Sequence, residues 1–204
     1  PCLHRQGETV SLMKRLDEPQ RRIYIQYLEN HVRPKRLKHS LGVAQTAVEL
    51  AEKYGADPVK AEIAGLLHDC SKGLNEEEMV RAAYAYGLHP DVYQLDSPQL
   101  LHPYVSAEMA KQDFGVTDEE VLNAIRRHMG GAPNLADYIE PNRSYPDVDE
   151  IRQMAKGSLF DTLCECLGRT MILTIREGSV VHPDTLTTWN AMKMRAKAQK
   201  EKVK

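Results

Sequence analysis

The sequence predicts an all-α protein. Apolar residues recur at spacings of three and four along most of the 204-residue chain, the period of a helix that is buried on one face. Capping residues, prolines in first turns and glycines at helix ends divide these stretches into short helices. No stretch alternates apolar and polar residues between hairpin turns, and no internal repeat is visible.

The first half of the chain is expected to form four helices. Pro34 and the Asp57-Pro58 pair are typical of a helical first turn. Asn75 with Glu78 three residues later has the form of a capping box. The expected ranges are Glu18 to about His31, Pro34–Tyr54, Pro58 to about Cys70, and Asn75–Gly87.

The second half shows the same signals less regularly. Thr117 with Glu120 predicts a capping box at the start of a helix that carries His128. Ser158 with Asp161 is a looser version of the same device. Helices are therefore expected from Thr117, over Leu159–Arg176 and from near Pro183. Loops are expected over Leu88–Pro98 and Ile139–Asp149, where prolines forbid a continuous helix.

The helix expected over 34–54 is apolar on two sides. One stripe contains Leu37, Leu41, Ala44, Val48 and Ala51. A second stripe contains Val43, Ala47 and Leu50, and His39 falls on it. A helix with two apolar sides lies between other helices, so we expect His39 to be interior. In the next helix, Ala61, Ala64 and Gly65 lie on the side of His68, and such small residues allow another helix to approach closely.

Composition narrows the classes of function. There are 27 Lys and Arg against 29 Asp and Glu, a net charge of −2, so the chain lacks the basic surface typical of nucleic-acid binding. No run approaches the roughly 18 apolar residues of a membrane helix, and no signal segment is visible. Cys164 and Cys166 match neither a zinc knuckle nor a redox pair. We therefore expect reduced thiols and a cytoplasmic protein.

Histidines and aspartates are the candidates for chemistry. Four of the eight histidines lie in or at the ends of core-forming helices: His39, His68, His102 and His128. A single such histidine is more often a hydrogen-bonded core residue than a ligand. However, Asp69 follows one of them and Asp137 comes later, and a carboxylate can bridge two cations that each bind imidazoles. Such mixed ligation suits Fe, Mn, Co, Ni or Zn.

The pattern H…HD…H…H…D resembles the HD-domain superfamily of metal-dependent phosphohydrolases. Within it, several segments are similar to the YqeK family, the symmetrical dinucleoside tetraphosphatases of bacteria. These segments are RLKHSLGVAQTA, LLHDCSK, LLHPYVSAEMA, AIRRH, ADYIEPNR and HPDTLTTWN, and together they run from about residue 34 to 193. The HD pair alone is a weak signal, whereas ADYIEPNR after it is specific.

The resemblance implies an HD-domain helical bundle with a di-metal site, usually iron, that cleaves diadenosine tetraphosphate into two ADP. Carried over by position, the implied metal ligands are His39, His68, Asp69, His102, His128 and Asp137. Asp69 would be the bridging ligand and, with Lys72, a catalytic residue. Lys72 and Arg143 would bind substrate phosphates, and Thr187 and Asn190 match a motif near the nucleotide.

The sequence and its family resemblance also suggest a domain organisation. We expect a leader of unknown role over residues 1–17, an HD domain over 18–193 and a lysine-rich tail over 194–204. The family has a further helical stretch between the positions of His128 and Asp137, where this sequence has eight residues. Either that helix is deleted, or residues near Pro133–Leu135 are missing from the sequence; we expect the second, because ADYIEPNR is intact.

Two other functions remain open at this level. The same site could act on a nucleoside mono- or triphosphate or a cyclic nucleotide, or the chain could be a nucleotide-binding regulator without turnover. The complete set of six ligands argues against the regulator, whereas a true loss of the helix before Asp137 would favour it. A homodimer is an open alternative to a monomer.

Overall fold

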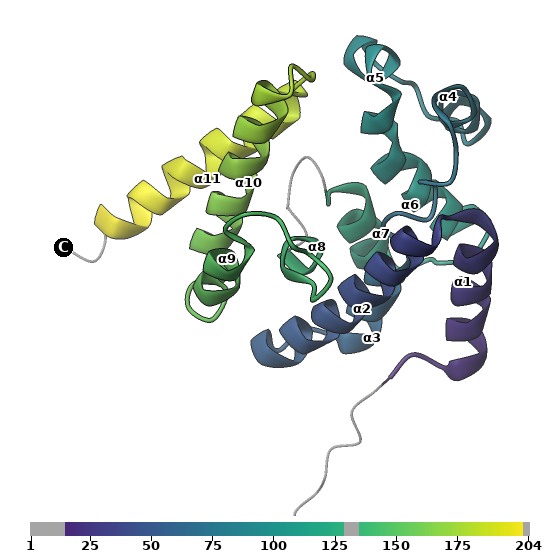
Figure 1. Ribbon diagram of the computed structural model, residues 1–204, viewed down its shortest axis with the longest axis horizontal. Coiled ribbons are helices and arrows are strands. Elements are labelled where there is room, and N and C mark those ends of the chain that lie inside the picture. Colours follow the sequence, from purple (N-terminus) through teal and green to yellow (C-terminus); the bar gives the residue numbers. More distant parts are fainter. Residues whose placement is uncertain (1–14, 129–134, 202–204) are drawn as a thin grey trace, which may run out of the picture.

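The computed structural model describes residues 15–128 and 135–201 (Figure 1). Its described residues contain helices and no strand, so the all-α prediction is confirmed. The elements are α1 Glu18–His31, α2 Pro34–Tyr54, α3 Pro58–Leu67, α4 Glu76–Ala85, α5 Val92–Asp96, the 3-10 helix η1 Pro98–Leu101, α6 His102–Gln112, α7 Glu119–Arg126, α8 Leu135–Ile139, α9 Val148–Met154, α10 Leu159–Arg176 and α11 Pro183–Glu201. None of the described helices is both long enough and apolar enough to cross a membrane.

Two apolar clusters hold the described helices together. The larger one joins α1, α2, α3, α4, α6 and α7, and its fully buried members include Leu28, Leu66, Leu67, Met79, Val105, Leu122 and Ile125. The smaller one joins α8, α9 and α10 through Leu135, Ile151, Ala155 and Cys166. Helix α2 contributes Ala44 to the first cluster and packs Leu50 against the second. Its two apolar sides therefore face two neighbours, as predicted.

Helices α2 and α3 pack closely together because the residue at their contact, Gly65, has no side chain. A Cβ atom placed on Gly65 would lie only 2.6 Å from the Cα atom of Ala44. This confirms that the small residues of α3 admit a close neighbour. The contact brings the end of α3, where His68 lies, against the part of α2 that carries His39.

Several capping signals of the sequence are present in the structure. Helices α1 and α2 have their expected bounds, and Gly55 ends α2 in the left-handed region with φ of 73°. Asn75 and Glu78 form the complete capping box of α4. The Ser158 hydroxyl accepts a hydrogen bond from the backbone N–H of Asp161 at the start of α10. These caps depend on residues close in sequence, which is why the sequence alone could locate them.

Some helix ends differ from the prediction. Helix α3 stops at Leu67 instead of continuing to Cys70, because the backbone N–H of Ser71 donates to the hydroxyl of Ser106 (3.2 Å) on α6. The cap of α7 is Asp118 instead of Thr117, and α7 ends at Arg126, so His128 follows the helix instead of lying in it. The expected loops also contain short helices: α5 lies within 88–98, and α9 begins at Val148. At the C-terminus, α11 continues to Glu201 and takes in most of the expected tail.

The close approach of α2 and α3 makes a stability prediction. Gly65→Ala should lower the free energy of unfolding by about 1–3 kcal/mol, because the added methyl group must push the two helices apart. The matched control is Gly157→Ala, whose methyl group would meet only the carbonyl oxygen of Met154 at an ordinary 3.5 Å. Urea denaturation followed by circular dichroism measures both; equal stabilities of the two variants would contradict this account of the helix contact.

Candidate metal centre

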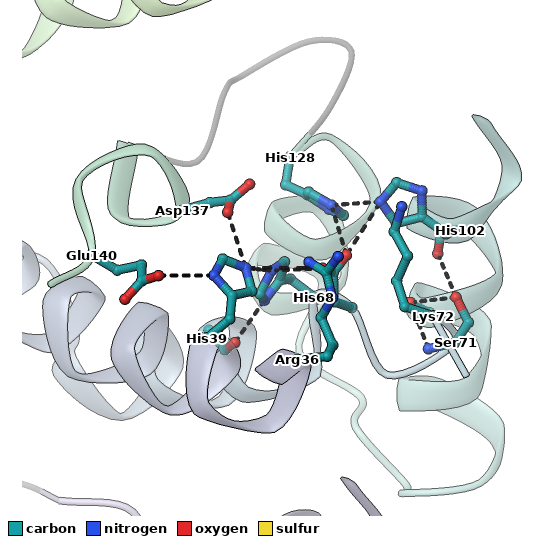
Figure 2. A network of polar contacts seen from close by, with 12 residues as sticks. Arg36, His39, His68, Ser71, Lys72, His102, His128, Asp137 and Glu140 are labelled. Carbon is teal, nitrogen blue, oxygen red and sulfur yellow. Dashed lines mark hydrogen bonds and ion pairs between the residues drawn. The ribbon is translucent and has the colours of Figure 1, made fainter. Parts of the chain in front are cut away.

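The six predicted ligands come together at one place from five separate segments of the chain. His39 lies in α2, His68 and Asp69 follow α3, His102 begins α6, His128 follows α7, and Asp137 lies in α8. Figure 2 shows Asp137 on one side of His39, with His128 and His102 towards the other end of the network. The four histidines and Asp69 are buried, and the side chain of Asp137 is 18% exposed.

Asp69 is shared by two groups of potential ligand atoms. One group is His39, His68 and Asp69, the other is Asp69, His102 and His128, and within each group the atoms lie within 4.8 Å of one another. The Oδ2 atom of Asp69 is 3.4 Å from Nε2 of His68. Its Oδ1 atom is 3.3 Å from Nε2 of His102 and 3.5 Å from Nε2 of His128. Each carboxylate oxygen therefore faces its own histidines, which is the arrangement that a bridging ligand requires.

Backbone carbonyls fix the tautomer of three of these histidines. The Nδ1 atoms of His68, His102 and His128 lie 2.7, 2.5 and 2.7 Å from the carbonyl oxygen of the residue three positions earlier. A carbonyl can only accept, so each Nδ1 carries the proton and donates it. In the neutral ring Nε2 then keeps its lone pair, and all three lone pairs are available on the side of Asp69.

His39 obtains its orientation from a carboxylate instead. Its Nδ1 atom is 3.1 Å from Oε1 of Glu140, and its Nε2 atom is 3.1 Å from Oδ1 of Asp137. Glu140 is only 1% exposed, and its other oxygen accepts hydrogen bonds from the backbone N–H (2.6 Å) and side-chain amide (2.8 Å) of Asn142. Gly42 leaves the space for this carboxylate, since a Cβ atom there would overlap it. The prediction missed Glu140, although the ADYIEPNR segment contains it.

The donor set fits divalent transition-metal cations. Nε2 of His39 lies 3.3 Å from Nε2 of His68, and Nε2 of His102 lies 3.0 Å from Nε2 of His128. Lone pairs that face each other this closely are unfavourable without a cation between them. The buried Oδ1 atom of Asp69 also accepts no hydrogen bond from any described residue. Four imidazoles and two carboxylates are ligands that Fe, Mn, Co, Ni and Zn accept.

Protonation states also favour cation binding. Burial lowers the pKa of His102 to about 4, which keeps this imidazole neutral near pH 7. Burial alone would raise the pKa of Asp69, but the facing histidines outweigh it and hold the pKa well below its usual value. The carboxylate is therefore ionised and the imidazole neutral, and these are the forms that coordinate metals.

Three positively charged side chains lie around the carboxylates. Arg36, which the prediction missed, donates from Nη1 to Oδ2 of Asp69 at 2.6 Å. Arg143 donates from Nε to the carbonyl oxygen of Asp137 (2.9 Å) and from Nη2 to its carboxylate. The Nζ atom of Lys72 is 3.4 Å from the side-chain oxygen of Gln99. Arg143 thus contacts the centre, and Figure 2 shows Lys72 beside it. The contact of both residues with phosphates stays a prediction.

The other two predicted substrate residues lie elsewhere. Thr187 and Asn190 are exposed on α11, and the Thr187 hydroxyl donates to the carbonyl oxygen of Pro183. Their contact with the nucleotide stays a prediction. Extra residues are also expected near Pro133–Leu135, a position that lies largely within 129–134 and so outside the described residues. Their existence stays a prediction. Asp137 itself lies in α8, directly after the buried residues Leu135 and Ala136.

Comparison with known proteins identifies the family. The HD domain family matches residues 36–156, a span that contains all six predicted ligands. The chain belongs to the HD-domain family. A solved HD-family structure from Clostridium acetobutylicum, described as a predicted HD superfamily hydrolase involved in NAD metabolism, aligns with a TM-score of 0.82 and 37% identity. The alignment covers 86% of this chain and 97% of that one, which confirms the predicted HD-domain helical fold.

Sequence relatives within the HD-domain family point to one activity. A Bacillus subtilis protein is 40% identical over 164 residues, covering 76% of this chain and 88% of the relative. One from Halalkalibacterium halodurans is 36% identical over 182 residues, covering 85% and 97%. Both are named symmetrical bis(5'-nucleosyl)-tetraphosphatase. The family resemblance inferred from the sequence is confirmed.

The contact between Glu140 and His39 predicts a role in metal retention. Glu140→Gln removes the charge that holds the His39 ring, so cation affinity at that end of the centre should fall by about 10–100-fold. Elemental analysis and metal titration of the purified variant measure this without any assay of activity. Glu62→Gln is the control, because Glu62 is also buried but pairs with Arg21. A Glu140→Gln protein with wild-type affinity for both cations would contradict the proposed role.

Proposed function

We propose that this protein hydrolyses diadenosine tetraphosphate symmetrically to two ADP, with two divalent cations bound by the six residues described above. The observation that carries the proposal is the pair of ligand groups sharing Asp69, in a chain whose 36–40% identical relatives bear the name of this activity. Cations bound there would supply an acidified water and neutralise charge at phosphorus. Metal-dependent hydrolysis is therefore the reaction class that both observations favour.

The side chains of the centre have separable roles in this proposal. Asp69 acts as the common ligand, because each of its oxygens faces a different histidine pair. The backbone-fixed histidines present their Nε2 atoms without rotation, so little reorganisation accompanies binding of the cations. Glu140 holds His39 in the same way from the other side. Ligand geometry is thus set by backbone carbonyls and by Glu140.

We assign Lys72 as the main side chain that binds the substrate phosphates. Burial lowers the pKa of Lys72, and the nearby Asp69 charge opposes this effect. Among the described residues, its ammonium group has one hydrogen-bond partner, Gln99 at 3.4 Å. Arg36 and Arg143, by contrast, already pair with Asp69 and Asp137. A partly desolvated cation with few partners is stabilised by an incoming anion. Arg143 would assist on the other flank, where its side chain is 36% exposed.

The cations and the compartment complete the proposal. Iron is the metal that the family resemblance implies, and the imidazole-rich ligand set suits it among the first-row divalent ions. The described cysteines, Cys70, Cys164 and Cys166, are all free and buried thiols. Free thiols are usual in the reducing cytoplasm, where we place the enzyme and its dinucleotide substrate.

Product analysis tests the reaction itself. Diadenosine tetraphosphate should give two ADP and neither AMP nor ATP at an early time point, resolved by nucleotide chromatography. In ¹⁸O-labelled water, one ADP of each pair should carry a single labelled oxygen on its terminal phosphate, because water attacks next to the central bridging oxygen. Appreciable AMP plus ATP would refute symmetric cleavage, and turnover of only mononucleotides or cyclic nucleotides would replace the proposed substrate.

Two substitutions separate the metal bridge from the phosphate contact. Asp69→Ala should abolish activity and lower the metal content from about two ions per chain, because both ligand groups lose their shared member. Lys72→Ala should keep the metal and lower turnover by roughly 10²–10³-fold, since it removes charge at the transition state. Elemental analysis with steady-state kinetics reads out both effects. The control is Lys60→Ala, a surface lysine that pairs with Asp118 and Glu120; loss of metal from Lys72→Ala would show that its assignment is wrong.

A further inference from the structure

The segment over residues 137–143 carries three side chains that lie at the metal centre: Asp137, Glu140 and Arg143. Helix α8, which contains the first of them, has only five residues. Backbone hydrogen bonds can fix the chain beyond it only in part, because Pro141 and Pro146 have no N–H group to donate. Side-chain donors are therefore needed to hold this segment in place.

Arg152 of α9 donates hydrogen bonds to three backbone carbonyls of this segment. Its Nη2 atom is 2.8 Å from the carbonyl oxygen of Glu140 and 3.1 Å from that of Arg143, and its Nε atom is 3.1 Å from that of Ile139. Its Nη1 atom pairs with the Asp149 carboxylate at 2.8 Å. Because a guanidinium group is planar, its N–H groups point in fixed directions. One side chain therefore sets the positions of three carbonyls relative to one another.

Arg152 is itself held in position by the packing of α9. Its neighbour Ile151 is 1% exposed and belongs to the smaller apolar cluster. From α10, the side chain of Arg169 pairs with Glu150 of α9 at 2.8 Å. Helix α9 is thus also held by contacts outside the segment 137–143, and it can act as a support for that segment.

The carbonyls that Arg152 binds belong to the part of the chain that orients two metal ligands. Oε1 of Glu140 is 3.1 Å from Nδ1 of His39. Arg143 donates to the carbonyl oxygen of Asp137 at 2.9 Å and to its carboxylate. Figure 2 shows Asp137 and Glu140 both directed at His39. A shift of this backbone would therefore move both ligands.

The other end of the metal centre depends on different backbone groups. The Nδ1 atom of His102 donates to the carbonyl oxygen of Gln99, and that of His128 donates to the carbonyl oxygen of Ile125. These carbonyls lie in η1 and α7, away in sequence from the segment 137–143. The two ends of the centre should therefore respond differently to a change of Arg152.

We propose that Arg152 is a positioning residue for the His39 end of the metal centre, meaning His39 and Asp137. It holds the backbone of Glu140 and Arg143, whose side chains orient those two ligands. The inference rests on the proposed function, since it concerns a cation that this end would bind. A direct effect of the charge has the opposite sign, because a positive side chain repels cations. Arg152 therefore favours cation binding only through the geometry that it imposes.

Metal titration of Arg152→Met tests the proposal. A chelator removes metal from the protein, and binding of Mn²⁺ is then followed by the electron paramagnetic resonance of the free ion. Wild-type protein should bind two ions. Arg152→Met should bind one of them roughly tenfold more weakly and the other with unchanged affinity, because only the His39 end loses its support. Loss of the positive charge alone would instead strengthen binding.

Two further variants separate positioning from general loosening of α9. Arg169→Met is the matched control, because Arg169 has a similar side-chain exposure (32%, against 29% for Arg152) and also holds α9. Among the described residues it pairs with carboxylates and donates to no carbonyl of the segment 137–143, so cation affinity should be unchanged. Arg152→Lys keeps the charge but lacks the planar group, and it should lose affinity in the same direction as Arg152→Met. It also tests the proposal if circular dichroism shows that Arg152→Met does not fold.

The outcomes separate this inference from the proposed reaction. Unchanged affinity in the Arg152 variants, or equal weakening of both ions, would overturn the positioning role. So would an equal loss in Arg169→Met. Wild-type protein that binds fewer than two ions would overturn both this inference and the two-cation centre on which it rests. The reaction is decided by the products from diadenosine tetraphosphate: a protein that forms two ADP, with Arg152 variants that bind both ions normally, would keep its function and lose this inference.

Discussion

The structure depends on one buried carboxylate that is shared between two pairs of histidines. Asp69 is 3% exposed, and no residue in the described part of the chain donates a hydrogen bond to its Oδ1 atom. A buried charge in this state is expensive unless other charges compensate it. Arg36 satisfies one oxygen at 2.6 Å, and the other faces only imidazole nitrogens. Positive charge therefore stabilises the cluster, and bound cations would supply it.

The local backbone determines the position of this carboxylate. Helix α3 stops early because Ser71 bonds to Ser106, and this turn presents His68 and Asp69 from a helix end. Neighbouring residues within a regular helix point about 100° apart and would not converge so well. Gly65 and Gly42 then allow α2 and Glu140 to approach without side-chain overlap. Helix ends and glycines therefore place most of the ligands, and His39 on the long helix α2 is the exception.

The sequence predicts these features unequally, and the difference has a physical basis. Caps such as Asn75 with Glu78, and the two apolar sides of α2 that make His39 interior, depend on residues within a few turns of each other. The role of Glu140 could not be predicted in that way, because its partner His39 is 101 residues away. The end of α3 depends on a similar distant contact, and α5 and α8 are too short for an apolar period to appear. The ligand set came from the family resemblance, and periodicity alone would have left each histidine ambiguous.

The metal centre also joins the two apolar clusters of the fold. His68, His102 and His128 belong to segments around the larger cluster, whereas Asp137 and Glu140 belong to α8 and its end, beside the smaller one. His39 on α2 contacts both sets. Ligands that bind only the folded chain stabilise it, and here that stabilisation would act across the junction between the clusters. The cavity between η1, α6 and α10 also has one wall on each side of this junction.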